Sequence, residues 1–485
     1  MKTSCPFLSF DGYKAAHREQ YPDKTEFIYA NMTPRKSRLK NIDYAVFFGL
    51  QYFIKEYLID RCNNDFFSQP IGKVIDKYKK RISSYLNKQN VYTEHFERLH
   101  TLGYMPLKIK ALPEGTRCSI KVPMCTVINT DKEFFWLTNQ IETLMSCTLW
   151  LGCTSATIAD NYRQAFDYYN KMTGIDPTFS LFQGHDFSFR GMGGLEAACI
   201  SGAGHLTSFV GTDTIPAIDF IEEYYGCDGL IGASVNASEH SVVSAGGSSE
   251  EDQVETLRRL ITKVYPTGIF SFVSDTFDYW TTISETAKLL KPEIMARDGK
   301  LVFRPDSGDP VKMIVGDPEA EPGSLEYKGS YQVLAEIFGT TKTSKGYNQL
   351  DNHVGLIYGD SITIERQEQI LRGLTAKGFA PDVVLGIGSF SYQYNTRDTL
   401  GFAVKATWAQ IDGKPKDIFK APKTDKGGEK KSAKGLVMVD NDLVLHDQCS
   451  WEEENMGILR PVFENGKLLV DEEFNNIRER LHPTK

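Results

Sequence analysis

In the second half of the chain, short apolar segments with the composition of β-strands alternate with segments of helical spacing. The apolar segments span residues 270–273, 301–303, 354–357 and 383–385, and they stop at Ser274-Asp275, Arg304-Pro305-Asp306, Tyr358-Gly359-Asp360 and Gly386. Between them, residues 253–265 carry apolar side chains three or four positions apart, which is typical of an amphipathic helix. Strands that alternate with helices predict a parallel sheet, and such sheets bind ligands beyond the carboxyl ends of their strands. The pattern therefore indicates an enzyme.

The first half of the chain has a different pattern. Residues 43–62 and 132–150 have apolar positions at helical spacing, whereas residues 107–111 alternate with a period of two. After Trp408, only short apolar segments and a terminal helix near residues 472–481 follow. Because these C-terminal pieces are too small to bury a core of their own, we expect them to pack on the N-terminal domain.

Together these patterns predict an α/β fold. Its centre is an irregular or incomplete (β/α) barrel, and an additional α+β domain is built from the N- and C-terminal segments. We predict an N-terminal α+β domain over residues 1–180, a barrel-like domain over residues 181–395, and a C-terminal segment over residues 396–485.

Composition narrows the class of protein. The 485 residues carry a formal net charge of -8, with a pI near 5.7, which argues against non-specific binding to nucleic acid or to an anionic membrane. No apolar run approaches the roughly 20 residues that cross a bilayer, and the first residues lack the apolar core of a signal peptide. The nine cysteines are scattered without a CxxC pair, as in proteins of reducing compartments. We expect a cytoplasmic protein.

The densest polar cluster is Arg304-Pro305-Asp306-Ser307-Gly308-Asp309-Pro310. An arginine can bind a phosphate or a carboxamide, and an aspartate can accept hydrogen bonds from ribose hydroxyls or hold a metal ion. The alternative is a simple Asx turn with an Arg–Asp surface pair. The position of the cluster, directly after a predicted strand, favours a binding site.

His240 lies within Ser238-Glu239-His240, and it is a second candidate for chemistry. A histidine could act as a base, a metal ligand or a phosphoryl acceptor, or it could be purely structural. Asp213 and Asp275 lie near predicted strand ends, and a flanking carboxylate orients an imidazole and makes it more nucleophilic. This favours a functional role for His240.

Small and basic residues indicate phosphate binding. Gly386-Ile387-Gly388-Ser389 follows a predicted strand, where backbone amides could approach a phosphate. Gly191-Met192-Gly193-Gly194 does not form a dinucleotide fingerprint, because Glu196 stands where the third glycine belongs. Basic residues that could converge on a polyphosphate, either within one subunit or across a subunit boundary, are Arg35, Arg397, Lys405 and Lys420.

Several blocks in order along the chain resemble the nicotinamide phosphoribosyltransferases, which are type II phosphoribosyltransferases. The blocks are Asp11-Gly12-Tyr13-Lys14, His185-Asp186-Phe187-Ser188-Phe189-Arg190-Gly191, Gly211-Thr212-Asp213-Thr214, Ser238-Glu239-His240-Ser241, Ser274-Asp275, Phe303-Arg304-Pro305-Asp306-Ser307-Gly308, Gly359-Asp360 and Thr396-Arg397-Asp398. The resemblance covers most of the chain. It implies transfer of a phosphoribosyl group from phosphoribosyl pyrophosphate to nicotinamide, which gives nicotinamide mononucleotide and pyrophosphate.

The resemblance also implies how nicotinamide is bound. Its ring would lie between Phe187 and Tyr13 of a neighbouring subunit, which makes the enzyme a homodimer with shared active sites. Asp213 would accept a hydrogen bond from the carboxamide NH₂, and Arg304 and Ser271 would help to place the carboxamide.

Other residues are assigned by the resemblance to the phosphoribosyl donor. Asp306, Gly359 and Asp360 match ribose and metal-side positions, and Gly388 and Ser389 match the 5′-phosphate cradle. The residues matched to the pyrophosphate and nucleotide phosphates are Arg35, Arg397, Lys405 and Lys420. Asp11 and Arg190, which lie within the shared blocks, are further predicted substrate-binding residues.

The resemblance finally implies an energetic role for ATP. His240 matches a histidine that becomes phosphorylated during ATP hydrolysis, and Asp275 would be its partner. We expect Asp306 and Asp275 to bind Mg²⁺, and we expect Arg304 and Asp306 to take part in catalysis with His240 and Asp275.

Two other functions fit the same sequence features. One is a nicotinate phosphoribosyltransferase, which would share the architecture and the donor but take the acid. The other is a catalytically silent relative that binds nicotinamide nucleotides. The joint presence of His240, Asp275, Arg304 and Asp306 argues against the silent relative.

Overall fold

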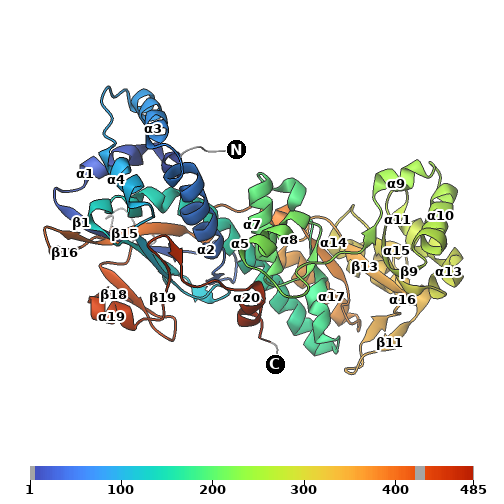
Figure 1. Ribbon diagram of the computed structural model, residues 1–485. Coiled ribbons are helices and arrows are strands. Elements are labelled where there is room, and N and C mark those ends of the chain that lie inside the picture. Colours follow the sequence, from blue (N-terminus) through green and yellow to red (C-terminus); the bar gives the residue numbers. More distant parts are fainter. Residues whose placement is uncertain (1–5, 421–431, 484–485) are drawn as a thin grey trace. The chain divides into compact units, whose positions relative to one another are not determined.

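The computed structural model describes residues 6–420 and 432–483 (Figure 1). Contacts between Cα atoms divide the chain into two compact units. Unit 1 comprises residues 1–157, 220–228 and 395–485, and unit 2 comprises residues 158–219 and 229–394. Residues 158–180 fall in unit 2 in this division, and the domain ranges given above stay a prediction.

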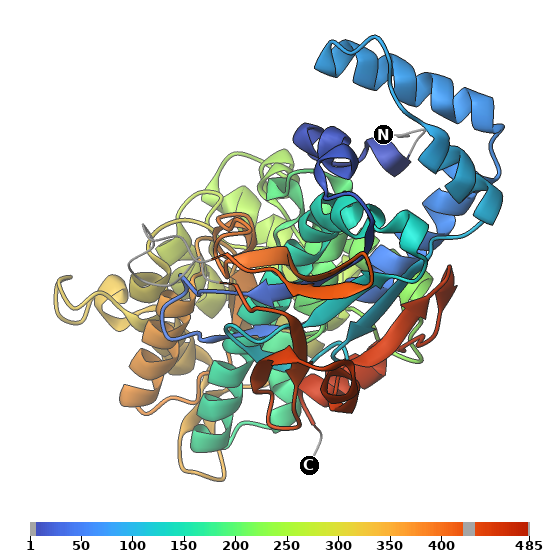
Figure 2. The ribbon, with the colours of Figure 1, turned by 90° about the vertical axis from the view of Figure 1, so that its left-hand side faces the viewer.

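Unit 1 is built on a seven-stranded antiparallel sheet. Across the sheet the strands are β16 (Lys414–Asp417), β15 (Phe402–Ile411), β1 (Thr25–Pro34), β5 (Cys125–Asn129), β3 (Leu107–Ala111), β19 (Arg460–Glu464) and β20 (Lys467–Leu468). β15 pairs with β1, and β19 pairs with β3, so C-terminal strands are hydrogen-bonded to N-terminal ones. Figure 2 shows the orange β15 beside the blue β1. The prediction that the C-terminal segment completes an N-terminal α+β domain is confirmed.

Buried aromatic residues hold this sheet together. Tyr29 of β1 and Trp408 of β15 are opposite each other in the register, and they pack with Leu436 and Val437 in one core cluster. The strand predicted from the period-two pattern of residues 107–111 is confirmed as β3, and its alternate residues Leu107, Ile109 and Ala111 are all buried. The helices of unit 1 include α1 (His17–Gln20), α2 (Leu50–Phe53), α3 (Ile71–Leu86), α4 (Glu94–Leu102), α19 (Trp451–Met456) and α20 (Phe474–Leu481).

Unit 2 contains a seven-stranded sheet in which every strand pair is parallel. Its strands, in order across the sheet, are β7 (Gly211–Thr212), β6 (Gly184–Asp186), β14 (Val384–Ile387), β13 (Val354–Tyr358), β10 (Asp298–Arg304), β9 (Thr267–Val273) and β8 (Asn236–Ala237). A parallel bridge joins Gly211 of β7 to Ala233, which precedes β8, so one segment contacts both edges of the sheet. The predicted irregular, incomplete (β/α) barrel is confirmed.

Helices follow the strands of unit 2 as the sequence predicts. They include α7 (Leu195–Leu206), α9 (His240–Ala245), α10 (Glu250–Arg259), α14 (Pro310–Val315), α16 (Ser330–Phe338), α17 (Ile364–Ala376) and α18 (Ser389–Tyr392). Two further helices, α5 (Leu137–Thr173) and α8 (Ile215–Tyr224), have residues in both units. None of the helices in the described ranges combines the length and apolarity that a membrane span requires.

One predicted helix begins too early. The helical spacing starts at Asp43, but Tyr44–Val46 forms strand β2, which pairs with β4 (Arg117–Ser119). The helix begins after Gly49, whose φ of 103° is in the left-handed region that favours glycine. The apolar spacing is continuous across this boundary, so the spacing alone could not reveal the change from strand to helix.

Candidate functional site

Residues that follow five parallel strands meet at one cavity in unit 2. The cavity has a volume of about 730 Å³, and the predicted site residues that line it are Phe187, Arg190, Asp213, Arg304, Asp306, Gly359, Asp360, Gly388 and Ser389. They come from the carboxyl ends of β6, β7, β10, β13 and β14, or from the loops that follow. The fold thus brings together nine of the predicted residues where parallel sheets bind their ligands.

A second cavity adjoins this one. It has a volume of about 350 Å³ and shares Phe187, Asp213 and Arg304 with the first cavity. Ser271 also lines it, beside apolar side chains such as Ile269. A polar cavity that meets a mainly apolar one suits a flat ring that carries a single polar substituent.

Asp213 is held in a defined orientation between the two cavities. Its Oδ1 atom accepts hydrogen bonds from His185 Nε2 at 2.9 Å and from Ser234 Oγ at 2.8 Å. Burial raises the pKa of Asp213, but the hydrogen bonds from His185 and Ser234 and the charge of Arg304 outweigh it, so the pKa lies below its ordinary value. An ionised carboxylate results. Among the described residues its Oδ2 atom has no donor, so it can accept one from a ligand.

Two hydrogen-bond donors close to Asp213 have no partner. Arg304 donates from Nη2 to the Ser238 carbonyl oxygen at 2.9 Å, but its buried Nε has no acceptor. The buried Ser271 hydroxyl also lacks a partner among the described residues. A buried polar group without a hydrogen bond costs about 1–3 kcal/mol. A ligand that offers both a donor and acceptors would therefore complete this site.

A histidine and two aspartates form the second part of the site. His240 begins α9, and its Nε2 lies 3.7 Å from Asp275 Oδ1 and 4.0 Å from Asp306 Oδ2. Its other ring nitrogen, Nδ1, lies 3.0 Å from Thr276 Oγ1. Asp275 Oδ2 accepts from the Asp306 backbone N–H at 2.9 Å and from Ser307 Oγ at 2.7 Å. These bonds fix the Asp275 carboxylate beside the imidazole.

The charges around Asp306 affect its ionisation. Burial raises the pKa of Asp306 above its ordinary value, and the nearby carboxylates of Asp275 and Asp360 act in the same direction. The positive charge of Arg304 and the imidazole of His240 oppose this shift. Added positive charge would therefore stabilise the ionised form of this cluster.

Asp275 and Asp306 are the carboxylates predicted to bind Mg²⁺. Within the described ranges, no group of three or more histidine, cysteine, aspartate or glutamate side chains is arranged to hold a metal ion. Mg²⁺ often binds through only one or two carboxylates, with waters and substrate phosphates as its other ligands. Asp275 Oδ1 is buried without a hydrogen bond, and it faces the same side as Asp306 Oδ2, since both lie near His240 Nε2. The two aspartates thus fit a Mg²⁺ ion that arrives with phosphate.

Glycine at position 386 makes room for the aromatic face of the site. A Cβ atom on Gly386 would overlap the ring of Phe187. Phe187 in turn packs against His185, with ring centroids 4.6 Å apart. Gly388, by contrast, has open space where a Cβ would lie. Its neighbour Ser389 begins the short helix α18 at the rim of the cavity.

Six predicted residues belong to unit 1. Arg35 and Lys405 line a cavity of about 190 Å³ over β1 and β15. Tyr13 is 62% exposed and lies 5.0 Å from the His17 ring. The remaining contacts are ordinary: Asp11 accepts from Thr143 Oγ1 at 2.8 Å, Arg397 lies 3.4 Å from Asp398, and the Lys420 backbone N–H donates to Ser432 Oγ at 3.0 Å.

The sequence analysis did not assign a role to His185 or Ser234. Both hold Asp213, and His185 also contacts Phe187. His185 and Phe187 are two positions apart around the end of β6, so period-two reasoning would have placed them on the same side of the strand. Ser234 lies in a loop, and no pattern in the sequence pointed to it.

Comparisons with known proteins agree with this arrangement. Residues 182–467 match the model of the nicotinate phosphoribosyltransferase (NAPRTase) family, and residues 7–109 match the model of the nicotinamide phosphoribosyltransferase N-terminal domain. The chain is 52% identical to a nicotinamide phosphoribosyltransferase of Acinetobacter baylyi, over 98% of this chain and 97% of the relative. It is 32% identical to the one from Xanthomonas campestris pv. campestris, over 97% of both chains.

Solved structures share the fold at low sequence identity. Nicotinate-nucleotide pyrophosphorylase from Pyrococcus furiosus matches with a TM-score of 0.59 and 15% identity, over 98% of this chain and 94% of that chain. Human nicotinic acid phosphoribosyltransferase matches with a TM-score of 0.56 and 14% identity, over 97% and 92%. By its family match and its identity to these relatives over nearly its whole length, the chain belongs to the nicotinate phosphoribosyltransferase family.

Proposed function

We propose that this protein transfers the phosphoribosyl group of phosphoribosyl pyrophosphate to nicotinamide. The ring nitrogen forms a bond to C1 of the ribose, and the bond from C1 to pyrophosphate breaks. The products are nicotinamide mononucleotide and pyrophosphate. Two relatives that this chain matches over 97% or more of its length are named nicotinamide phosphoribosyltransferases.

The main support for this proposal is the group of polar atoms around Asp213 that lack hydrogen-bond partners in the described part of the chain. A carboxamide has an NH₂ group that donates and a carbonyl oxygen that accepts. Asp213 Oδ2 can accept from the NH₂, and the partnerless donors Ser271 Oγ and Arg304 Nε can serve the carbonyl oxygen. The substrate would satisfy three groups that the protein leaves open.

The same set disfavours nicotinate. Its carboxylate would face the Asp213 carboxylate, and two like charges about 4 Å apart repel by roughly 4 kcal/mol at an effective dielectric constant near 20. This corresponds to about a thousandfold discrimination. A nicotinate phosphoribosyltransferase would need a neutral or cationic side chain at this position.

Aromatic side chains support the chemistry of the ring. Nicotinamide becomes a pyridinium cation as the new bond forms, and an aromatic face stabilises a cation by about 0.5–2 kcal/mol. Phe187 offers one such face at the cavity. Tyr13 of a neighbouring subunit offers the other in a homodimer, in keeping with the 62% exposure of its side chain.

The phosphoribosyl donor occupies the polar cavity. Asp306 and Asp360 bind the ribose hydroxyls beside Gly359, and Gly388 and Ser389 receive the 5′-phosphate. Arg190 at the cavity is a further substrate-binding residue. The basic side chains of Arg35, Arg397, Lys405 and Lys420 would bind the pyrophosphate and nucleotide phosphates, and Asp11 is a further substrate-binding residue. Mg²⁺ at Asp275 and Asp306 would neutralise pyrophosphate as it leaves. Charge and hydrogen bonds, rather than a protein nucleophile, stabilise an oxocarbenium-like transition state.

ATP assists the reaction through His240. The Asp275 carboxylate, 3.7 Å from Nε2, electrostatically favours a proton on that nitrogen, which leaves Nδ1 as the nucleophile. Nδ1 forms a bond to the γ-phosphorus of ATP as the bond from that phosphorus to ADP breaks. Thr276 Oγ1 lies 3.0 Å from Nδ1, and this contact must break before Nδ1 can react. Later hydrolysis returns the free histidine and phosphate. The phosphohistidine adds negative charge near the carboxylates and helps to order Mg²⁺ and the donor.

One experiment tests the proposed activity. The purified protein is incubated with phosphoribosyl pyrophosphate and Mg²⁺, with nicotinamide or nicotinate in parallel, with and without ATP. Mononucleotide should form from nicotinamide and should form faster with ATP. A preference for nicotinate would identify the acid as the substrate, and no product from either base would identify a silent relative.

A further inference from the structure

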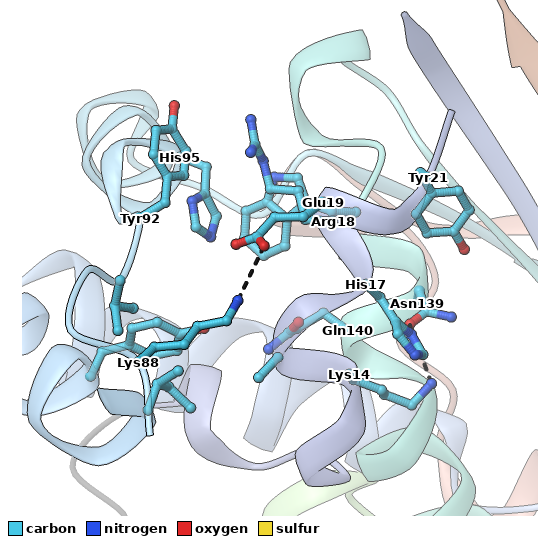
Figure 3. A pocket seen from close by; sticks show the side chains of 15 residues that line it. Lys14, His17, Arg18, Glu19, Tyr21, Lys88, Tyr92, His95, Asn139 and Gln140 are labelled. Carbon is cyan, nitrogen blue, oxygen red and sulfur yellow. Dashed lines mark hydrogen bonds and ion pairs between the residues drawn. The ribbon is translucent and has the colours of Figure 1, made fainter. Parts of the chain in front are cut away.

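A small, largely enclosed cavity lies in unit 1. None of its lining residues is assigned above to binding or catalysis, although Lys14 directly follows Tyr13 in the sequence. The volume of the cavity is about 30 Å³ (Figure 3). It is lined by Lys14, His17, Arg18 and Glu19 on one side and by residues of α3, α4, the loop between them and the start of α5 on the others. In Figure 3, Arg18 and His95 enter it from different elements.

Three side-chain nitrogens in this lining are buried and have no hydrogen-bond partner within residues 6–420 and 432–483. They are Arg18 Nε, His95 Nδ1 and Trp136 Nε1. His95 is 8% exposed and Trp136 is 3% exposed, so bulk water cannot serve them well. Buried polar atoms in native proteins nearly always have a partner, and when no protein atom is available the partner is a water or an ion. Three such atoms on one cavity indicate an occupant.

Ring contacts fix these nitrogens in place. The His95 ring meets the Trp136 ring edge-on at a centroid distance of 4.8 Å and stacks on Tyr92 at 5.5 Å. The guanidinium carbon of Arg18 lies 4.8 Å from the centre of the Tyr92 ring. A set of donors held this rigidly is prepared for a ligand before the ligand arrives.

The charges around the cavity favour an anion over water. Glu19 is paired with Lys88 at 3.1 Å, and Glu142 is paired with Lys14 at 2.9 Å. Arg18 has no ion pair with any carboxylate of the described residues. Its positive charge therefore has no carboxylate partner there. With the His95 proton on Nδ1 all three nitrogens are donors, and a water molecule can accept from only two of them, whereas a halide or a carboxylate can accept from all three.

We propose that this cavity binds one small monovalent anion, a halide ion or a carboxylate the size of formate. Arg18 supplies the positive charge, and Arg18 Nε, Trp136 Nε1 and His95 Nδ1 donate to the anion. His95 takes part as a neutral imidazole with its proton on Nδ1. Burial, together with the charge of Arg18, lowers the pKa of His95 to about 3, so this side chain stays uncharged at neutral pH without the anion.

The anion would link three parts of unit 1. It would join α1, which carries Arg18, to His95 of α4 and to Trp136 just before α5. The segment of residues 12–20 would then open less often. That segment carries Tyr13, so an effect on catalysis follows if Tyr13 acts as proposed above, and this last step rests on the proposed function.

Hydrogen exchange of the full-length protein tests binding without using activity. The protein is compared in sodium bromide and in sodium gluconate at equal ionic strength, because gluconate is too large for the cavity. Some backbone amides of residues 12–20 exchange only when the cavity opens. Their exchange rate should fall by a factor of about 1 + [Br⁻]/Kd as bromide is added, until exchange without opening becomes the faster route. Crystals grown in bromide should show an anomalous peak within hydrogen-bond distance of Trp136 Nε1.

Two variants and a control complete the test. Arg18→Gln and Trp136→Phe should each abolish the bromide effect, and Arg81→Gln, an exposed position on α3, should retain it. If Trp136→Phe fails to fold, Arg18→Gln alone decides. Equal exchange in both salts, or density for a water only, would overturn the proposal, as would a bromide effect that survives Arg18→Gln.

Discussion

His185 donates a hydrogen bond from Nε2 to Asp213 Oδ1 at 2.9 Å while its ring packs against Phe187. One side chain thus contacts both the group that would select the carboxamide and the ring that would support the base. A carboxylate only accepts, so the proton of His185 must reside on Nε2. We infer that His185 is a positioning residue for the base.

The first prediction concerns this contact. His185→Leu removes the donor and should lower the preference for nicotinamide over nicotinate about tenfold, because a hydrogen bond to a charged group contributes about 1.5–3 kcal/mol and Asp213 is half exposed. His185→Gln, which keeps an N–H donor, should recover part of the preference. The measurement is kcat/KM for both bases. An equal loss of activity toward both bases would reduce His185 to a structural residue.

The second prediction concerns Asp213 itself. Asp213→Asn removes the negative charge that would repel nicotinate, while Ser234 can still donate to the side-chain oxygen. Rejection of nicotinate should fall by up to about a thousandfold, on the Coulomb estimate given above. Competition between the two bases in one reaction measures the ratio directly. An unchanged ratio would show that selection lies elsewhere.

The third prediction concerns ATP. His240→Ala should abolish ATP hydrolysis and leave part of the basal synthesis, because the base site around Asp213 does not use His240. Asp275→Asn should slow phosphorylation as well, since it weakens the orientation of the imidazole. Labelled ATP should transfer acid-labile phosphate to the unaltered protein and none to His240→Ala. Label that persists in His240→Ala would place the acceptor at another residue.

The fourth prediction concerns the neighbouring subunit. Tyr13→Ala and Asp213→Ala should each be nearly inactive, whereas an equal mixture of the two should recover about one quarter of full activity. Random exchange makes half of the dimers mixed, and each mixed dimer has one intact site. Activity is measured after exchange of subunits, and Tyr168→Ala, another exposed tyrosine, is the control. No recovery, or full activity of a monomer on dilution, would rule out a shared site.

The fifth prediction concerns stability and pH. Glu114 is buried, and burial raises its pKa to about 7 although it accepts hydrogen bonds from the backbone N–H groups of Gln51 and Gly49. The unfolded chain ionises near pH 4.5, so the folded state holds an extra proton between about pH 4.5 and 7. The contribution of Glu114 to stability therefore falls as pH rises through this window, by about 3 kcal/mol in total.

Glu114→Gln tests this prediction because glutamine does not titrate. The variant should be less stable in absolute terms, since glutamine has a single acceptor oxygen and its NH₂ group cannot accept the second backbone N–H. Its free energy of unfolding should nevertheless depend less on pH between 4.5 and 7 than that of the unaltered protein. Denaturant unfolding at several pH values gives both curves. Parallel curves would show that Glu114 stays ionised in the fold.

Sequence patterns predicted the centre of the site well. The runs that became β9, β10, β13 and β14 are apolar because both faces of a parallel sheet are covered, and that makes them visible in the sequence. Arg304, Asp306 and Gly359 follow these strands directly, so the topology alone brings them together. Their convergence could be predicted without any structure.

Other parts were beyond reach of the sequence. β6, β7 and β8 have only two or three residues each, which is too short for a period to be measured. The bonds from His185 and Ser234 to Asp213 join segments of the chain that meet only in the folded barrel. The partnerless nitrogens near His95 depend on packing among three elements, and no spacing in the sequence records it.

The pairing of β19 with β3 has a consequence for synthesis on the ribosome. More than three hundred residues separate Phe463 from Ile109, which are partners in the register. Unit 1 therefore cannot close its sheet until residue 468 has left the exit tunnel, whereas unit 2 has all its residues by position 394. The barrel can fold first. Meanwhile the N-terminal strands of unit 1 have unpaired edges until their C-terminal partners are synthesised, and a chaperone would be of most use at these edges.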